Sequence, residues 1–456
     1  MTTTEPPARP LTGSKWLSGP YAPVDAEITA LDLPVVGTIP EELDGRYLRN
    51  GPNVIGAVDP ATYHWFTGDG MVHGIRLRDG RAEWYRNRWV RSTKVSQLLG
   101  ETPAPGERHG GFDNANTNVI GLAGRTYALV EAGARPIELS EGLATVCHSD
   151  FAGTLAHGFT AHPKVDPATG DLHAVAYHWA LPHLEYIVVG ADGRVRQTES
   201  IDVPDGPMIH DCSITERWMV IFDLPVTFDL DAAMTGAGFP YGWNDAHAAR
   251  VGLVPLNGRG ADVRWFDVEP CYVFHPLNAF DDGDRVVLDV VRYERVFDQA
   301  RLGPDDTAPA WYRWILDTAT GTVQEQQMSD VRFEFPRVDE RVVGRPYRWG
   351  YGAETSSDNG NDFGGRLVRI DAARGEVVAV DLGSGRRSGE WVMVPREPDA
   401  PEDGGWLMAL VHDAGRDASE LMILPAEAPD DGPIARIALP ARVPVGFHGN
   451  WIPASS

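Results

Sequence analysis

Four histidines of this chain share one local setting, in which an apolar run leads into the histidine and a turn or a new strand follows. They are His162 in FTAHPK, His210 in MIHDC, His275 in YVFHPLN and His448 in VGFHGNW. Neutral imidazole nitrogens are suitable ligands for first-row transition metals. A single histidine of this kind is more often a structural side chain. The fourfold recurrence of the setting is therefore what predicts a metal site made of these four residues.

The other histidines and the cysteines are assigned structural roles. His173, His178 and His183 follow one another at five-residue intervals, which would place neighbours on opposite faces of a strand. The three cysteines are Cys147, Cys212 and Cys271. Their spacings match no zinc-binding pattern. The sequence also shows no convincing pair of side chains for acid–base catalysis.

The elements that must position the four histidines are short strands. Apolar or alternating runs are separated by Gly and Asp turns, as in IRLRDGRAEWY (75–85), YIVVGADGRVRQ (186–197) and VRIDAARGEVVAV (368–380). Each of these patterns predicts a β-hairpin, and a content of 49 Gly and 35 Pro suits many tight turns. Segments 92–113 and 225–247 interrupt the rhythm, and we expect them to form excursions over one face of the protein.

The hairpins recur with no long amphipathic helix between them, which predicts an all-β propeller with four-stranded blades of about 50 residues. The four histidines are separated by 48, 65 and 173 residues, which is about one, one and three blades. Equivalent strand ends of a propeller point toward one central axis, so the imidazoles would converge there. Because no linker divides the chain, we expect a single domain over residues 1–456, with an irregular segment at 1–30.

The net charge of the chain and the length of its apolar runs argue against some binding partners. A formal net charge of −25 argues against nucleic acid, because an acidic surface repels phosphates. The same charge argues against a purely electrostatic hold on anionic membranes. The chain has no apolar run of the roughly 18 residues that a spanning helix needs. It also lacks the basic and apolar regions of a signal peptide. We therefore expect a cytoplasmic protein.

Ordered motifs along nearly the whole chain resemble those of the carotenoid cleavage oxygenases. They are YLRNGPN (47–53), HWFTGDGMVHG (64–74), ANTNV (115–119), FTAHPK, FHPLNAF and FHGNW. Together these motifs are specific, whereas any one alone would be weak. The resemblance implies a single seven-bladed β-propeller with a cap of loops and short helices over an axial iron site. One Fe(II) per chain would be held there by the four histidines named above.

The resemblance also implies roles for four more residues. Glu131 in YALVEAG, Glu334 in RFEFPRV and Glu390 in SGEWVMVPR match glutamates that accept the Nδ1–H of ligating imidazoles. Such a contact fixes the tautomer and leaves Nε2 for the metal. Three glutamates would leave one of the four histidines to another partner or to water. Thr117, in ANTNV, matches a position beside an open coordination site. The alternatives are solvated charges at strand ends and, for Thr117, an ordinary strand residue.

The activity that the resemblance implies is cleavage of a C=C double bond with O2 as co-substrate, giving two carbonyl products from a carotenoid or apocarotenoid. Stilbene-cleaving members carry a lysine before the first of the three glutamates and a tyrosine in an RYVRT-like stretch. This chain has Val130 and Trp89 at those positions, which favours an apolar polyene. The alternatives are cleavage of a stilbene or phenylpropenoid, a non-cleaving isomerase-type member, and a binding propeller without enzymatic activity.

An apolar polyene must reach the site from a membrane or from a carrier. Segment 224–243 contains large apolar side chains among small residues, namely Phe228, Leu230, Met234, Phe239, Tyr241 and Trp243. One interpretation is an apolar rim that makes peripheral contact with lipid. The alternative is a loop that packs on the cap of the propeller.

Overall fold

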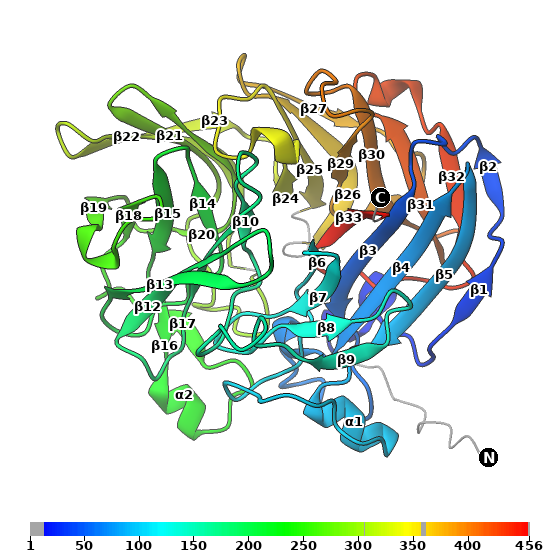
Figure 1. Ribbon diagram of the computed structural model, residues 1–456, viewed down its shortest axis with the longest axis horizontal. Helices are drawn as coiled ribbons and strands as arrows, with labels where there is room; N and C mark the ends of the chain where they lie inside the picture. The colour runs from blue at the N-terminus through cyan, green and yellow to red at the C-terminus, as the bar shows by residue number, and fades with distance from the viewer. Residues whose placement is uncertain (1–12, 305, 357–361, 455–456) are drawn as a thin grey trace.

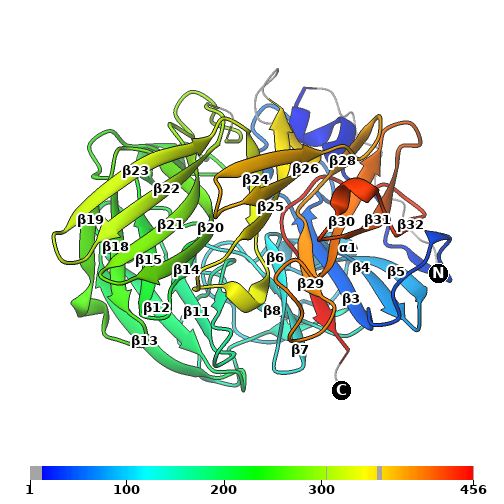
Figure 2. The ribbon, with the colours of Figure 1, turned by 90° about the horizontal axis from the view of Figure 1, so that it is seen from above.

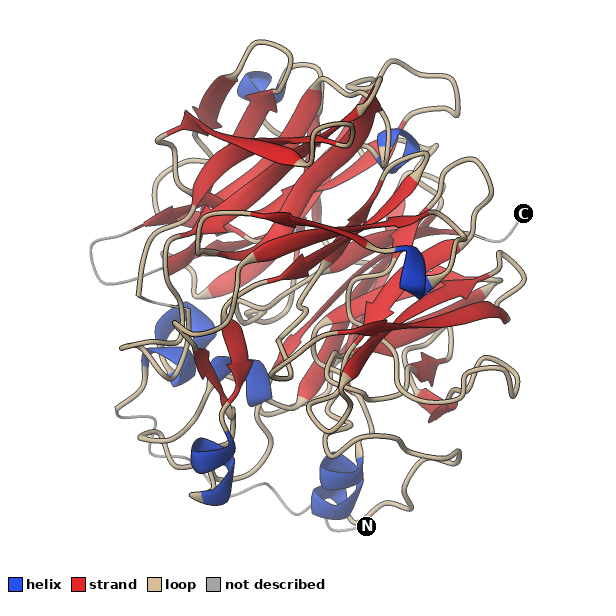
Figure 3. Ribbon diagram, turned by 90° about the vertical axis from the view of Figure 1, so that its left-hand side faces the viewer, coloured by secondary structure: helices blue, strands red, loops and turns tan. Residues whose placement is uncertain are grey.

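The computed structural model describes residues 13–304, 306–356 and 362–454. Strands dominate this part of the chain, and the helical segments are short (Figure 3). The α-helices are α1 (Thr93–Leu99) and α2 (Leu230–Met234). The 3-10 segments are η1 (Lys15–Leu17), η2 (Gly19–Tyr21), η3 (Trp65–Thr67), η4 (Gly260–Asp262), η5 (Glu340–Val342) and η6 (Pro429–Asp431). The all-β class is therefore confirmed. No helix in the described ranges is long and apolar enough to cross a membrane.

Four antiparallel sheets have four strands each. One contains β6 (Asn118–Leu122), β7 (Arg125–Leu129), β8 (Ile137–Leu139) and β9 (Thr145–His148). The next contains β10 (Lys164–Val165), β11 (Leu172–Ala176), β12 (His183–Val189) and β13 (Val195–Asp202). A third contains β14 (Cys212–Ile214), β15 (Trp218–Asp223), β18 (Arg250–Pro255) and β19 (Arg264–Asp267). The fourth contains β20 (Tyr272–Asp282), β21 (Arg285–Tyr293), β22 (Ala310–Asp317) and β23 (Thr322–Ser329).

Three further sheets complete the described strands. A five-stranded sheet has the order β1 (Thr29–Leu31), β5 (Arg81–Trp89), β4 (Gly70–Arg78), β3 (Gly45–Pro52) and β33 (Gly449–Pro453). A two-stranded sheet pairs β16 (Val226–Phe228) with β17 (Tyr241–Trp243). A ten-stranded sheet contains β2 (Val35–Gly37), β32 (Ala435–Ala438), β31 (Ala418–Pro425), β30 (Gly405–Asp413), β28 (Arg386–Ser388), β26 (Asp362–Asp371), β25 (Trp349–Ser356) and β24 (Phe333–Arg337), with β27 (Glu376–Val380) beside β26 and β29 (Val392–Pro395) beside β30.

The larger sheets lie side by side around a common centre (Figures 1 and 2). Strands from the two ends of the described chain close this ring. The early strand β3 pairs with the late strand β33, and β2 pairs with β32. Backbone hydrogen bonds thus join the beginning and the end of the ring in two neighbouring sheets.

Burial explains why the strands differ in sequence. The middle strands β11 and β12 are packed on both faces, and all five residues of β11 (LHAVA) are buried. A strand covered on both faces reads as a continuous apolar run. The outer strands β13 (VRQTESID) and β23 (TVQEQQMS) alternate between partly buried and exposed residues. Each sheet therefore passes from an apolar interior to a polar outer edge.

The turn chemistry that was expected from the sequence is present. The hairpin β4–β5 turns at Asp79 and Gly80, which have φ values of 49° and 67°. Two successive positive φ angles are typical of the turn that matches strand twist. The expected excursions are also found: segment 92–113 contains α1 and irregular chain, and segment 225–247 contains β16, α2 and β17. In the N-terminal segment, residues 1–12 lie outside the described residues, whereas η1, η2 and the beginning of β1 fall within 13–30.

Replacing Gly45 with alanine should weaken the closure of the ring. A Cβ at this position would lie 2.6 Å from the Ile452 carbonyl oxygen and 2.9 Å from Pro453 Cα. Because backbone atoms cannot move aside cheaply, we expect Gly45→Ala to lower the free energy of unfolding by about 1–3 kcal/mol. Chemical denaturation monitored by tryptophan fluorescence measures the change. Gly389→Ala is the control, since the nearest atom to its Cβ would be 3.9 Å away. Equal unfolding midpoints for the two variants would contradict the prediction.

Candidate metal centre

Each of the four histidines belongs to the inner edge of a different sheet. His162 and His210 each lie two residues before a strand, β10 and β14 respectively. His275 lies within β20, and His448 directly precedes β33. Each of these strands is at one end of the strand order of its sheet. Because these edges face the centre of the ring, histidines distant in sequence meet there.

A bulge helps to aim His275. The pairing of β20 with β21 shifts register between Val273 and Pro276 and again between Pro276 and Asn278. A bulge bends a strand and redirects its side chains, and such irregularities are common beside functional sites. The proline that directly follows His275 lacks a backbone N–H, so it fits a place where the ladder is interrupted.

The four imidazoles form one buried cluster. One ring nitrogen from each lies within 4.8 Å of the corresponding atom of every other. Nε2 of His210 is 3.3 Å from Nε2 of His275, and none of the four histidines is more than 8% exposed. A metal–nitrogen bond of about 2.1 Å places two ligand nitrogens roughly 3–4 Å apart. The observed spacing therefore fits one shared ion.

Three of the four imidazoles direct Nδ1 to a buried or half-buried glutamate. The Nδ1–carboxylate distances are 2.8 Å for His210–Glu131, 2.6 Å for His275–Glu334 and 2.9 Å for His448–Glu390. A carboxylate accepts only, so in each pair Nδ1 carries the proton. Nε2 then has its lone pair free and pointing into the cluster, as metal ligation requires.

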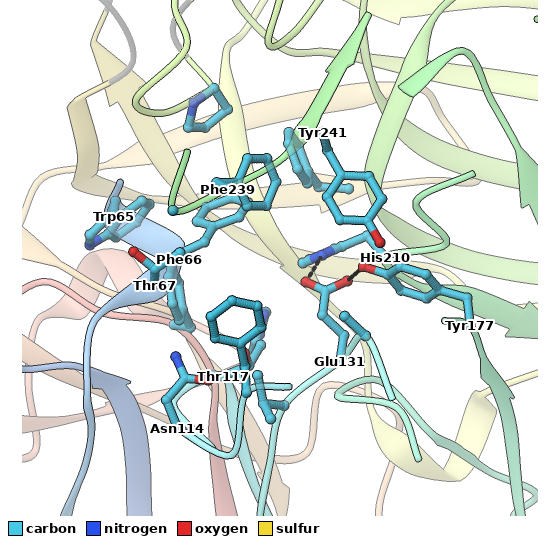
Figure 4. A pocket seen from close by; sticks show the side chains of 18 of the residues that line it. Trp65, Phe66, Thr67, Asn114, Thr117, Glu131, Tyr177, His210, Phe239 and Tyr241 are labelled. Atoms are coloured by element: carbon cyan, nitrogen blue, oxygen red, sulfur yellow. Dashed lines mark hydrogen bonds and ion pairs between the residues drawn. The ribbon is translucent and has the colours of Figure 1, made fainter. Parts of the chain in front are cut away.

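The glutamates are held in turn by donors of their own. Tyr177 donates its hydroxyl to Oε2 of Glu131 at 2.8 Å (Figure 4). Tyr293 donates to Oε1 of Glu334 at 3.0 Å, and the backbone N–H of Phe335 donates to Oε2 at 2.6 Å. A buried carboxylate without such partners would be costly to keep ionised. These contacts therefore fix the position of both carboxylates beside their imidazoles.

Glu390 is held by a charge as well as by hydrogen bonds. Nη1 of Arg337 lies 3.1 Å from its Oε2, and the Gly449 N–H donates to the same oxygen at 2.8 Å. Burial raises the pKa of the Glu390 carboxyl, but the Arg337 charge and the hydrogen bonds from His448 and Gly449 outweigh burial and lower the pKa to about 2. Glu390 is therefore a carboxylate throughout the neutral range.

His162 differs from the other three because no glutamate among the described residues contacts it. The nearest carboxylate is Asp211, whose Oδ2 is 3.9 Å from Nδ1, too far for a hydrogen bond. Asp211 instead pairs with Lys164 at 2.8 Å. Burial and the neighbouring imidazoles hold the pKa of His162 well below its usual value. Its Nε2 is buried and has no hydrogen-bond partner among the described residues. An orphaned lone pair that faces three other imidazoles is the feature that best fits a bound metal.

Thr117 lies beside the cluster and is 6% exposed. Its Oγ1 donates to Oδ1 of Asn116 at 3.0 Å, and its carbonyl oxygen accepts the backbone N–H of His448 at 3.1 Å. The Thr117 hydroxyl proton is thus engaged within the protein. The side chain lines the cleft that reaches the histidines.

A mostly apolar cleft leads to the cluster. Its volume is about 1120 Å³ including its open mouth, and its wall includes His210, His275 and His448. Aromatic rings surround the inner end: Phe66, Phe274, Phe335 and Phe447. Figure 4 shows the part of the wall that contains Glu131 and Tyr177. This arrangement gives an apolar molecule access to the imidazoles.

Sequence reasoning named the eight residues that the structure brings together here: His162, His210, His275, His448, Glu131, Glu334, Glu390 and Thr117. It missed the groups that hold the glutamates, which are Tyr177, Tyr293 and Arg337. No spacing in the sequence signals these partners, because each comes from a different sheet than the glutamate it contacts or from a distant part of the same sheet. Only the burial of a glutamate implied that partners had to exist.

The family of the chain follows from comparison with known proteins. A sequence model of the family described as Retinal pigment epithelial membrane protein matches residues 21–453. The chain belongs to this family. It is 45% identical to a carotenoid cleavage oxygenase of Mycobacterium tuberculosis, over 96% of this chain and 98% of that protein. It is also 32% identical to a carotenoid 9,10(9',10')-cleavage dioxygenase of Crocus sativus, over 96% and 89% of the two chains. The resemblance to carotenoid cleavage oxygenases is thus confirmed.

Solved structures of the same family have the same fold. The lignostilbene dioxygenase of Pseudomonas brassicacearum superimposes with a TM-score of 0.87 at 30% identity, covering 98% of this chain and 100% of that one. A cobalt-substituted apocarotenoid oxygenase of Synechocystis gives a TM-score of 0.85 at 28% identity, covering 95% and 97%. These neighbours support a propeller-type fold for the described residues.

Replacing Glu334 with glutamine should weaken metal binding. The amide cannot offer His275 the same charged acceptor, so the imidazole loses its fixed tautomer. We expect Glu334→Gln to lower metal affinity about 10–100-fold. Competition with a chromophoric chelator, using Fe(II) without oxygen and Co(II) in air, measures the affinity. Glu427→Gln serves as the control because Glu427 pairs with Arg396 at the surface. Unchanged affinity in Glu334→Gln would exclude an orienting role for this carboxylate.

Proposed function

We propose that this protein is a non-haem Fe(II) dioxygenase that cleaves a C=C double bond of a carotenoid or apocarotenoid with O2, giving two carbonyl products. The observation that carries the proposal is the cluster of four buried imidazoles at the inner end of an apolar cleft. One Fe(II) per chain and O2 as co-substrate complete the proposal. The names of the relatives support an oxygenase and a polyene substrate.

Some residues of the centre would bind the ion, and others would orient the binding residues. His162, His210, His275 and His448 would hold the ion through Nε2. Fe(II) bound there would supply the activation of O2 without a porphyrin. Glu131, Glu334 and Glu390 would each accept the Nδ1–H of one imidazole, which fixes its orientation and leaves Nε2 for the ion. Thr117 would limit the space beside the ion.

The cleft would supply binding and alignment. An apolar alkene gains free energy from burial of about 25 cal/mol per Å², and an elongated cleft fixes which bond lies over the ion. The aromatic rings around His210 and His448 exclude water from the same space: Phe66 stacks near His210 at 6.2 Å, and Phe335 lies edge-on to His448 at 5.5 Å, between ring centroids. No general acid or base is needed for such a reaction.

Two positions bear on the choice between a polyene and a phenolic stilbene. Val130 is 9% exposed and lines the cleft, where stilbene-cleaving members place a lysine. Trp89 donates its indole N–H to the carbonyl oxygen of Asn53 at 2.9 Å and is not part of the cleft wall. Both features support the carotenoid or apocarotenoid substrate. The alternatives are a stilbene or phenylpropenoid dioxygenase, an isomerase-type member, and a binding propeller.

We also propose seven blades in a single domain over residues 1–456. The ten-stranded sheet divides naturally into two blades, β24–β27 and β29–β32 with β2, which β28 bridges by pairing with both β26 and β30. Together with the five-stranded sheet and the four sheets of four strands, this division supports the count. The segments with α1, α2 and η3 would form the cap, since residues of η3 and of segment 235–241 line the cleft.

Anaerobic reconstitution with Fe(II), followed by O2 and an all-trans apocarotenal, tests the function. We expect two shorter carbonyl products by mass spectrometry, and a loss of at least about 1000-fold in rate for His210→Ala because one ligand is missing. His183→Ala, which changes a histidine outside the cluster, should retain the wild-type rate. If the protein cleaves resveratrol or isoeugenol but not the apocarotenal, the substrate is an aryl alkene and not a polyene. No turnover of any alkene by iron-loaded protein would overturn the dioxygenase proposal.

We further propose that an apolar rim makes peripheral contact with a membrane. Within segment 224–243, Leu230 and Met234 are 62% and 80% exposed. Phe112 and Trp179, from two other segments, are 61% and 50% exposed, and we include them in the rim. Phe112 and Trp179 line the cleft, and α2, which carries the other two, leads into the segment that forms its wall. The rim thus surrounds the place where an apolar substrate would enter. Because the chain is acidic, the contact would rest on apolar burial rather than on charge.

The double substitution Leu230→Glu with Met234→Glu should reduce binding to phosphatidylcholine vesicles about tenfold or more, since two large side chains would lose their burial. Flotation of protein with vesicles measures the partition. Val378→Glu is the matched control, because Val378 is 53% exposed but lies on the outer strand β27. Equal partition of wild type and the double variant would remove the membrane contact from the proposal.

A further inference from the structure

One polar atom of the cleft stands apart from the others. The Tyr241 hydroxyl is buried and has no hydrogen-bond partner among the described residues, and Tyr241 is 6% exposed. The other hydroxyls and carboxylates of the inner cleft have partners within the protein: Thr117, Glu131, Tyr177, Tyr293 and Glu334. A buried hydroxyl without a partner is unfavourable unless another molecule satisfies it.

The position of Tyr241 is fixed by the excursion that precedes β18. Tyr241 begins β17 and pairs with Phe228 of β16. Its ring lies 5.5 Å from Phe239 and 6.1 Å from Tyr177, measured between centroids. On its outer side Phe228 stacks on the exposed Trp179 at 4.7 Å. Tyr241 therefore stands between the rim and the group formed by Tyr177, Glu131 and His210.

The Tyr241 side chain lines the cleft that a substrate would enter. Figure 4 shows the Tyr241 side chain directed toward the group that contains Glu131, Tyr177 and His210, and Tyr241 belongs to the wall of the cleft. Burial, together with the charge of Glu131, raises the pKa of Tyr241 above its ordinary value. The phenol is thus neutral and offers both a proton and a lone pair. Glu131 accepts hydrogen bonds from His210 and Tyr177, and the Tyr241 hydroxyl makes none to it in the described residues.

An unpaired buried hydroxyl can reflect either a ligand-binding role or imperfect packing, and a second tyrosine helps to distinguish the two. The Tyr351 hydroxyl is also buried without a partner, and Tyr351 is 0% exposed. Tyr351 lies in an apolar cluster with Leu367, Trp391 and Leu407, away from the cleft. No ligand could reach it there. Tyr241 has the same unpaired hydroxyl, but its side chain lines the cleft.

We propose that Tyr241 is a specificity-determining residue that hydrogen-bonds an oxygen atom of the substrate, so that the cleft selects alkenes bearing a hydroxyl or carbonyl group over hydrocarbons of the same shape. This inference rests on the proposed function for the identity of the cleft as the alkene site. The oxygen would sit on the His210 side of the cleft, between the ion and the rim. Val130 offers no polar group on this side of the cleft, whereas the phenol of Tyr241 does.

Two matched pairs of ligands test the proposal by binding, without turnover. One pair is an apocarotenal and the polyene hydrocarbon of the same length; the other is 4-hydroxystilbene and stilbene. Dissociation constants come from quenching of tryptophan fluorescence in metal-free protein, since Trp65 and Trp179 line the cleft. Tyr241→Phe should weaken binding of the oxygenated member of at least one pair about tenfold and leave the hydrocarbon within about twofold. Tyr351→Phe should leave all four constants unchanged.

Several results would overturn the proposal. Equal losses for both members of a pair would show that Tyr241 only shapes the cleft. No loss for any ligand would show that the hydroxyl binds water alone. Failure of the wild type to bind any of the four probes would remove the cleft as an alkene site. Binding with the expected discrimination, but without cleavage after iron loading, would retain the role of Tyr241 and overturn the dioxygenase proposal instead.

Discussion

The structure depends on holding four imidazoles face to face in a buried space. An imidazole nitrogen removed from water needs a partner, and four lone pairs directed at one point have none unless an ion is there. Each Nδ1 must therefore donate its proton to an acceptor outside the cluster, or remain without a strong hydrogen bond. Glutamates meet this need for His210, His275 and His448. Buried glutamates then need donors, which explains why two tyrosines and an arginine surround the centre.

The ring of sheets is suited to this demand because each inner edge contributes a small number of atoms to the same place. Side chains from one sheet could not approach a common point from four directions. Strands from different sheets can, and the outer strands keep the assembly in water. The same geometry leaves one side of the centre open to a cleft walled by aromatic rings. The metal-binding imidazoles and an apolar cleft for the substrate can thus lie close to each other.

Much of this centre could be predicted from sequence, because its residues lie in local motifs. FTAHPK, FHPLNAF and FHGNW each combine a strand end, a turn and a histidine, and the alternation of the hairpins indicated an all-β protein. Tyr177 and Arg337 could not be found in this way, since their roles arise from contacts between sheets that no local pattern records. Tyr241 was noted only as an apolar member of an excursion, whereas its unpaired hydroxyl depends on how β17 lies against the cleft. The bridging strand β28 likewise has no signature in the sequence, because the blade rhythm is lost where it joins two groups of strands.

The closure of the ring has a consequence for the order in which the protein assembles. His162, His210 and His275 come from three sheets built by hairpins between near neighbours in sequence, and such local contacts form early. His448 arrives with β33, whose partner β3 lies near the other end of the described chain. Pairing of segments so far apart is slow, because the intervening chain must already be compact. The last ligand, His448, would therefore reach the centre in the same step that seals the ring.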